Sequence, residues 1–304
     1  TCTELGLLDQ ALDHADRGRQ IFESGTVDPY IFINSLAGKG YALWHKGERR
    51  KTMEVGKILL DFADHQSDCR SKVMGYCCLG WGHLISGDVK AAAECFQKAM
   101  DISTDPWYAV FPKLALCYGF ITNNQLENAG QLIDDILAFS RERGAEFAGT
   151  PAAFFRGVAL IAGGQLNTGF NILQGLLRDW WERGSRLRYV LCGQILATIY
   201  ADLTRNPKGL GPITVVKNLR AIFNALPFTG VRALDNFEVL TEMTRDIGAN
   251  GALGRAYLHW GHLLKERGQV DRAGQCYIEA AKFFEQCEAD GYLKQANEAM
   301  DSVL

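Results

Sequence analysis

Proline is scarce in this sequence, with 7 residues in 304, and no apolar run approaches the roughly 18 residues that a membrane-spanning helix needs. An excess of charge is also missing, because 32 basic and 35 acidic residues leave a net charge of −3. Broad binding to nucleic acids or to anionic membranes is therefore disfavoured. Because no basic segment followed by an apolar one marks a signal peptide, we expect a cytoplasmic protein.

Paired cysteines are missing as well. The nine cysteines are odd in number, no two are spaced as CxxC, and most lie in apolar segments such as GYCCLGW at residues 75–81. We expect reduced cysteines that act as small core side chains, which agrees with a cytoplasmic compartment. Glycine, by contrast, is frequent, with 32 residues. Much glycine and little proline predict many short helices separated by turns.

Catalytic motifs are absent. The sequence has no phosphate-binding loop, no G-x-S-x-G and no H-E-x-x-H, and the GKG at Gly38–Gly40 lacks the spacing and the hydroxyl of a phosphate loop. His259 and His262 occur together in HWGH, but no cysteine or carboxylate accompanies them at metal-ligand spacing. We therefore expect a protein that is not an enzyme and that holds no cofactor or metal.

Two charged clusters are the remaining candidates for chemistry. Asp134 and Asp135 are adjacent, so on a helix their side chains point about 100° apart, which favours a solvated face over paired acid–base work. Arg183, Arg186 and Arg188 follow two tryptophans and either mark a surface helix end or bind a phosphate or an acidic peptide.

An internal repeat organises the chain. Five turns are centred on glycine or asparagine, and they are Gly47, Gly87, Asn124, Gly164 and Gly268. The first four follow one another at a nearly constant spacing of about 40 residues, which is typical of helical repeat arrays. Small residues lie seven before and mostly five after each turn, and larger apolar residues mostly lie nine after it. Offsets of 5, 9 and 12 share one face of a helix, so each turn joins two closely packed antiparallel helices.

This pattern resembles the tetratricopeptide repeat (TPR), most closely in the sets Gly80–Gly87–Ala92–Phe96–Ala99 and Gly261–Gly268–Ala273–Tyr277–Ala280. The resemblance implies an all-α, right-handed solenoid of helix pairs. The period near 40 and the texture of residues 251–304 resemble the long-repeat arrays of bacterial class III adenylate/guanylate cyclases and signalling ATPases. A role in bacterial signal transduction is the corresponding expectation.

The repeat register defines the domain prediction. Residues 1–304 form a single solenoid, with an irregular interruption at residues 205–230 and a capping helix at residues 289–304. Within the interruption we expect an extra helix near Pro212–Leu226. Gly6 precedes Gly47 by one further repeat length, so it reads as the turn of a repeat whose first helix is missing, and we expect a longer parent protein.

In such arrays the first helix of each pair lines the concave face. The positions that lie thirteen, ten, six and three before each turn are aromatic and almost uncharged, whereas the last repeat is more basic, with Arg255 and Lys265. These side chains either pack between repeats or form a recognition groove, because aromatic residues are favoured anchors at binding sites. The candidate groove residues are Asn34, Tyr41, Trp44, Trp81, Phe111, Tyr118 and Phe154.

The expected function is that of a non-catalytic scaffold or regulatory module, which binds a protein or a peptide segment in this groove. The alternative is a small-molecule-sensing domain of a nucleotide cyclase or an ATP-dependent regulator. A large pocket among Tyr41, Trp81, Tyr118 and Phe154 with convergent polar groups would favour the alternative. The sequence specifies no oligomeric state.

Overall fold

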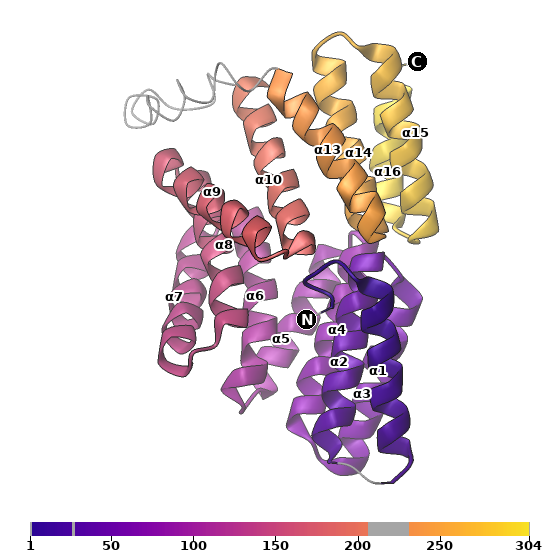
Figure 1. Ribbon diagram of the computed structural model, residues 1–304, viewed down its shortest axis with the longest axis vertical. Helices are drawn as coiled ribbons and strands as arrows, with labels where there is room; N and C mark the ends of the chain where they lie inside the picture. The colour runs from indigo at the N-terminus through magenta and orange to yellow at the C-terminus, as the bar shows by residue number, and fades with distance from the viewer. Residues whose placement is uncertain (1, 26–27, 206–230, 304) are drawn as a thin grey trace.

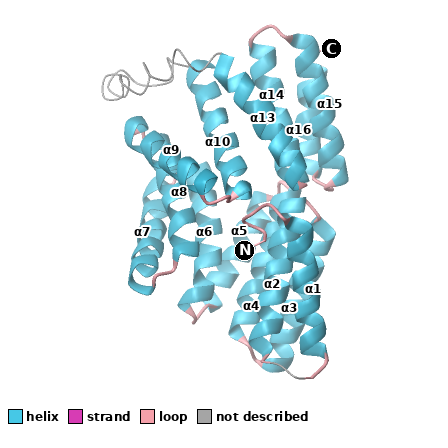
Figure 2. Ribbon diagram, viewed as in Figure 1, coloured by secondary structure: helices cyan, strands magenta, loops and turns pink. Residues whose placement is uncertain are grey.

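The computed structural model describes residues 2–25, 28–205 and 231–303, and in these ranges the chain is all-α. Figure 2 shows helices joined by short loops, and consecutive helices pack against each other as antiparallel pairs in a stacked, repeat-like array. The fourteen helices of the described residues are α1 (Leu8–Glu23), α2 (Pro29–Lys46), α3 (Arg49–Gln66), α4 (Cys69–Ser86), α5 (Val89–Ile102), α6 (Pro106–Thr122), α7 (Leu126–Arg143), α8 (Glu146–Ala162), α9 (Leu166–Glu182), α10 (Arg186–Arg205), α13 (Val231–Ile247), α14 (Asn250–Glu266), α15 (Val270–Gln286) and α16 (Asp290–Asp301).

The predicted turns lie where the helices end. All five turn centres adopt the left-handed conformation, with φ of 77° at Gly47, 81° at Gly87, 56° at Asn124, 80° at Gly164 and 72° at Gly268. Glycine and asparagine adopt this conformation at the lowest cost, which explains their recurrence from one turn to the next. Several helices begin with an aspartate side chain that accepts a backbone N–H, as Asp88 does from Ala91 at 3.0 Å.

Close packing within a pair follows the predicted small-to-large pattern. A Cβ added at Gly80 would lie 2.6 Å from the ring of Phe96, and one added at Gly261 would lie 2.5 Å from the ring of Tyr277. The less regular pair α8–α9 has the same arrangement, with Gly157 against Leu173. The absence of a side chain at these positions therefore brings the two helices of each pair together.

The array curves until its end meets its beginning. Figure 1 shows α13–α16 next to the ends of α1–α4, and α14 packs on α2 while α16 packs on α4. A Cβ added at Gly251 would lie 3.7 Å from Cα of Gly47, and one added at Gly291 would lie 3.6 Å from Cα of Gly87. The four glycines thus place the starts of α14 and α16 directly on the turns that follow α2 and α4.

The predicted domain boundaries are only partly visible. The helix expected near Pro212–Leu226 lies outside the described residues, as does nearly all of the predicted interruption. The expected capping segment contains α16, whose Ala296 and Ala299 are buried against the preceding helix pair. Of the helices described, none is both long and apolar enough to cross a membrane.

Candidate functional site

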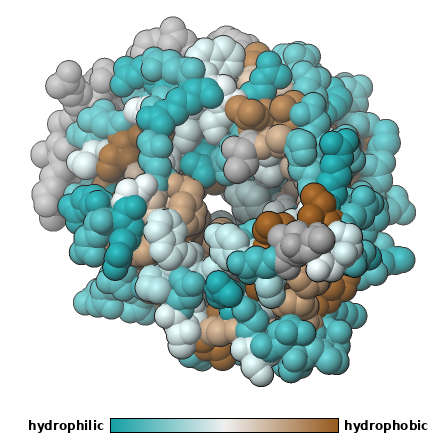
Figure 3. Space-filling model, turned by 60° about the horizontal axis from the view of Figure 1, so that its bottom comes forward, coloured by the Kyte–Doolittle hydropathy of each residue, from teal (hydrophilic) through white to brown (hydrophobic). Residues whose placement is uncertain are grey.

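A cavity of about 1180 Å³ occupies the centre of the array. Its lining comes mainly from the helices on the inner side, namely α1, α2, α4, α6, α8, α10, α13 and α14, together with Tyr292 of α16. Figure 3 shows an opening at the centre of the molecule, and in that view the opening passes through. The contacts of α14 with α2 and of α16 with α4 close the cavity around its circumference.

The residues predicted for the groove come together in this cavity. All seven line it, although they come from four different helices: Asn34, Tyr41 and Trp44 of α2, Trp81 of α4, Phe111 and Tyr118 of α6, and Phe154 of α8. Some also pack on one another, so ring contacts and open surface occur side by side on this face. Trp81 is buried, with 4% of its surface exposed, whereas Tyr118 is 40% exposed.

An aromatic cluster forms one wall. The indoles of Trp44 and Trp81 stack with ring centroids 5.5 Å apart and planes 7° apart, and the ring of Tyr41 lies 5.5 Å from Trp81 in an edge arrangement. Such contacts bury large apolar surfaces at well-defined positions. The wall therefore presents a broad aromatic surface suited to a flat apolar group.

Charged residues from distant parts of the chain also reach the cavity. The guanidinium of Arg188 donates to Oε1 of Glu4 at 3.0 Å, which joins α10 to the N-terminal turn. The guanidinium of Arg255, on α14, lies 5.9 Å from the ring centroid of Tyr292. Among the described residues no carboxylate lies within ion-pair distance of Arg255.

His45 is the most deeply buried ionisable group of the wall. It is 7% exposed, its ring lies 4.7 Å from that of Tyr41, and Nε2 has no hydrogen-bond partner among the described residues. Burial, followed by the positive charges of Arg255 and Arg188, lowers the pKa of His45 to about 3. Burial, followed by the negative charge of Glu4, raises the pKa of Tyr41. Both side chains are therefore neutral near pH 7.

The face of α14 that lines the cavity carries a second histidine. His259 is open to the cavity, but the surrounding protein and then the charges of His262 and Arg255 lower its pKa to about 4. Its neighbour His262 lies outside the cavity lining, and Nδ1 of His262 is 3.0 Å from the hydroxyl of Tyr277. His259 thus faces the cavity, whereas His262 contacts Tyr277.

The other clusters singled out in the sequence lie on the surface or separate. Asp134 forms an ion pair with Arg156, and Asp135 forms one with Lys113 at 3.4 Å. The two carboxylates are therefore exposed and each pairs with a different cation. Arg183 is exposed and pairs with Glu146 at 2.9 Å, away from the cavity-lining Arg188. The three arginines therefore do not converge on one anion.

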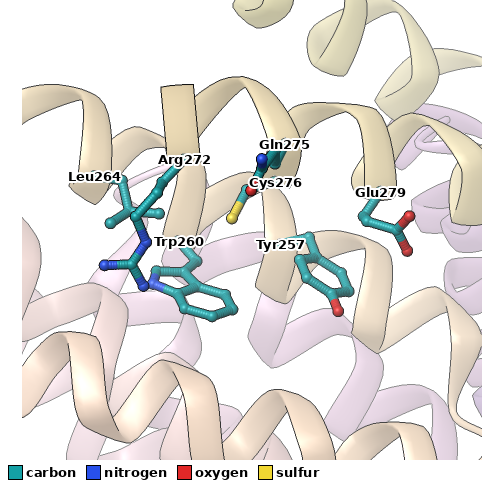
Figure 4. Close-up of a pocket in the computed structure, with 7 residues that line it drawn as sticks. All are labelled: Tyr257, Trp260, Leu264, Arg272, Gln275, Cys276 and Glu279. Carbon is teal, nitrogen blue, oxygen red and sulfur yellow. The ribbon is translucent and has the colours of Figure 1, made fainter. Parts of the chain in front are cut away.

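A smaller pocket of about 230 Å³ lies between α14 and α15. Figure 4 shows that Arg272 lies beside the indole of Trp260, while Tyr257 and Glu279 lie at the other end. Burial raises the pKa of the Cys276 thiol to about 11, so this thiol stays protonated and is a poor nucleophile. The central cavity is the more convincing site, because it is larger and unites the predicted residues.

The sequence did not indicate how Glu4, Arg188 and Arg255 would be arranged. The repeat register places Arg255 in the helix before the turn at Gly268, at the first of the four positions that face the concave side, and this signal was sufficient to find it. Glu4 and Arg188 are 184 residues apart and share no repeat position. No protein-family model matches the chain, and no curated protein matches it.

Proposed function

We propose that this chain is a TPR-like regulatory module that binds a small molecule in its central cavity. The observation that carries the proposal is the cavity of about 1180 Å³, in which an aromatic wall and several polar groups converge. Ligand sites are typically concave, mostly apolar and about 300–1,000 Å³ in volume, with a few polar groups that fix orientation. The central cavity is concave and mostly apolar with a few polar groups, and its volume lies slightly above that range.

The closed circumference favours a small molecule over a folded protein. Because α14 and α16 pack on α2 and α4, a partner's surface reaches Trp44 and Trp81 only if the ring opens. The neutral states of His45 and Tyr41 support a binding role, since a general acid or base works best with a pKa near the working pH.

Protein interaction remains a second proposal, supported by one observation. The opening in Figure 3 passes through the molecule in that view, and an extended chain end is thin enough to enter such a passage. In either case we propose a non-catalytic module of a larger cytoplasmic bacterial signalling protein, in which occupancy of the cavity changes the curvature of a right-handed solenoid.

A cavity-filling variant tests the small-molecule proposal. Gly38 lines the cavity, and a Cβ added there meets no atom within 4 Å, so we expect the side chain of Gly38→Phe to enter the cavity and fill part of it. We expect the neutral dye N-phenyl-1-naphthylamine to bind the intact chain with 1:1 stoichiometry, measured by fluorescence, and to raise its Tm. Gly38→Phe should weaken this binding at least tenfold.

Gly175→Phe is the matched control. Gly175 lies on α9, away from the cavity, and a Cβ added there also meets nothing within 4 Å. This variant should bind the dye like the unaltered chain. Equal affinity of the Gly38→Phe variant, or no binding to the unaltered chain, would contradict the proposal.

A further inference from the structure

The titratable groups that line the cavity include more basic than acidic side chains. Two arginines and one glutamate reach it, together with three histidines, and neither lysine nor aspartate is found among the described lining residues; the six groups are Glu4, Arg188, Arg255, His14, His45 and His259. Since Glu4 pairs with Arg188, and His45 and His259 are neutral near pH 7, one positive charge remains that has no counter-ion among the described residues. This charge belongs to Arg255.

Arg255 acts on several sides of the cavity. Its charge lowers the pKa of His45, of His259 and, against the effect of burial, of Tyr118. These three side chains belong to α2, α14 and α6, so the guanidinium lies within electrostatic reach of three helices of the wall. A partly buried guanidinium without a carboxylate is unfavourable, and an anion would relieve that cost.

A second unpaired polar group lies on the same wall. His45 is more than nine-tenths buried and lines the cavity, yet its Nε2 atom has no hydrogen-bond partner among the described residues. Buried polar atoms are nearly always paired, so an orphaned one at a cavity wall points to a group that is missing from it. Nε2 has almost no accessible surface, so a ligand oxygen would become that partner after a small shift of the ring.

Apolar and aromatic surface makes up most of the remaining lining. The stacked Trp44 and Trp81 lie on one side, and Tyr118 and Phe154 line the cavity from α6 and α8. A ligand with several charges would leave most of them without partners here, because Arg255 is the one unpaired cation among the lining residues that the structure describes. The lining instead fits one acidic group on an apolar body.

On the basis of the proposed function, we propose that the cavity binds an organic anion that carries a single acidic group on an apolar, largely aromatic body. Arg255 pairs with the acidic group, the imidazole of His45 contacts its polar edge, and the wall around Trp44 and Trp81 packs against the body. A charge-assisted hydrogen bond from a guanidinium is the strong and directional contact in such a site.

Two dyes that differ in one group test the ligand class. We would titrate the intact chain with 8-anilino-1-naphthalenesulfonate and with N-phenyl-1-naphthylamine, which has the same ring system without the sulfonate. We expect Arg255→Gln to weaken the sulfonate dye at least tenfold and to leave the neutral dye within twofold. Arg255→Lys, which keeps the positive charge, should retain most of the sulfonate affinity.

Arg141→Gln is the control, because it removes an arginine that is exposed on α7 and lies outside the cavity lining. It should leave the binding of both dyes unchanged. Circular dichroism of each variant shows that it is folded, since the sulfonate dye also binds partly folded chains. Unchanged sulfonate binding in Arg255→Gln, with the neutral dye still bound, would overturn the anion inference and leave the proposed function standing. Equal loss of both dyes in Arg255→Gln would also overturn it. Failure of both dyes on the unaltered chain would refute the proposed function itself.

Discussion

A neutral histidine beside two arginines makes His45 the residue whose energetics depend most clearly on pH. Its pKa is about 3 in the folded chain and about 6.5 in an unfolded one. Because the folded pKa is the lower one, the neutral imidazole contributes its full stability above pH 6.5. That contribution is lost as the pH falls from 6.5 towards 3, since the unfolded chain takes up the proton first.

His45→Gln should remove this acid sensitivity. Each pH unit below the unfolded pKa corresponds to about 1.4 kcal/mol. We therefore expect His45 to lower the free energy of unfolding at pH 4.5 by about 2–3 kcal/mol relative to pH 7.5. Urea unfolding of both proteins at the two pH values measures the difference. The free energy of unfolding should fall by that much less in His45→Gln than in the unaltered chain.

His65→Gln serves as the comparison for His45. His65 is an exposed histidine, and its backbone hydrogen bond to Asp61 and the charge of Asp61 raise its pKa. Its replacement should leave the acid-induced loss close to that of the unaltered chain. Parallel pH profiles for His45→Gln and the unaltered chain would show that His45 does not titrate as described.

The residues of the site differ in how far the sequence could predict them. Positions counted back from each turn found all seven aromatic and polar groove residues, and the same count places Arg255 on the cavity-lining face. These positions follow from helix periodicity, which is local information. The pairing of Glu4 with Arg188 depends on the curvature of the whole array, which no local pattern contains.

At the scale of the helix pair, glycine without a side chain opposite an aromatic ring sets the packing distance. Gly80→Ala should destabilise the protein by about 1–3 kcal/mol, because the new Cβ would lie 2.6 Å from the ring of Phe96 and overpack the pair. Gly130→Ala is the control, since a Cβ there meets nothing within 4 Å and should stabilise the helix by about 0.5–1 kcal/mol. Urea denaturation gives both values; equal effects of the two replacements would contradict this account.

Element positions were predictable because the turn residues carry a backbone requirement. The φ values of 77° at Gly47 and 56° at Asn124 are those that glycine and asparagine tolerate best, so the turn centres could be found from residue type and spacing. The same repeat predicts an intra-pair contact even at Gly157 and Leu173, where the aromatic residue is absent. Helix termini such as Ser67, which is left-handed without being glycine, gave no comparable signal.

For the whole molecule, the decisive contact repeats itself. Gly47 and Gly87 are one repeat apart, and their partners Gly251 and Gly291 have the same separation. The C-terminal helices α14 and α16 therefore meet α2 and α4 in the same register. The sequence does show Asn-Gly and Asp-Gly at the starts of α14 and α16, but closure depends on the small rotation between repeats, summed over the array. The sequence therefore left open whether this face packs between repeats or forms a groove, and no local pattern indicates the closed circumference of the structure.

Ion pairs also join the C-terminal helices to the N-terminal ones. Their contribution to stability can be compared with that of the glycine contacts as the cause of closure. Arg50 pairs with Glu288 at 2.8 Å, but Arg50 is 83% exposed. Exposed pairs contribute about 0–1 kcal/mol, whereas a side chain forced into a close backbone contact costs about 1–3 kcal/mol. Closure should therefore depend on the glycines more than on the charges.

Gly291→Leu tests this at the scale of the ring. A Cβ at Gly291 would lie 2.8 Å from the carbonyl oxygen of Ser86, so the larger side chain should push α16 off α4 and open the circumference. We expect a larger radius of gyration in X-ray scattering and at least tenfold weaker binding of N-phenyl-1-naphthylamine. Gly251→Ala, whose Cβ would lie at an ordinary 3.7 Å from Cα of Gly47, and Arg50→Gln should leave both unchanged. If Arg50→Gln opened the ring and Gly291→Leu did not, the ion pairs rather than the glycine contacts would hold it closed.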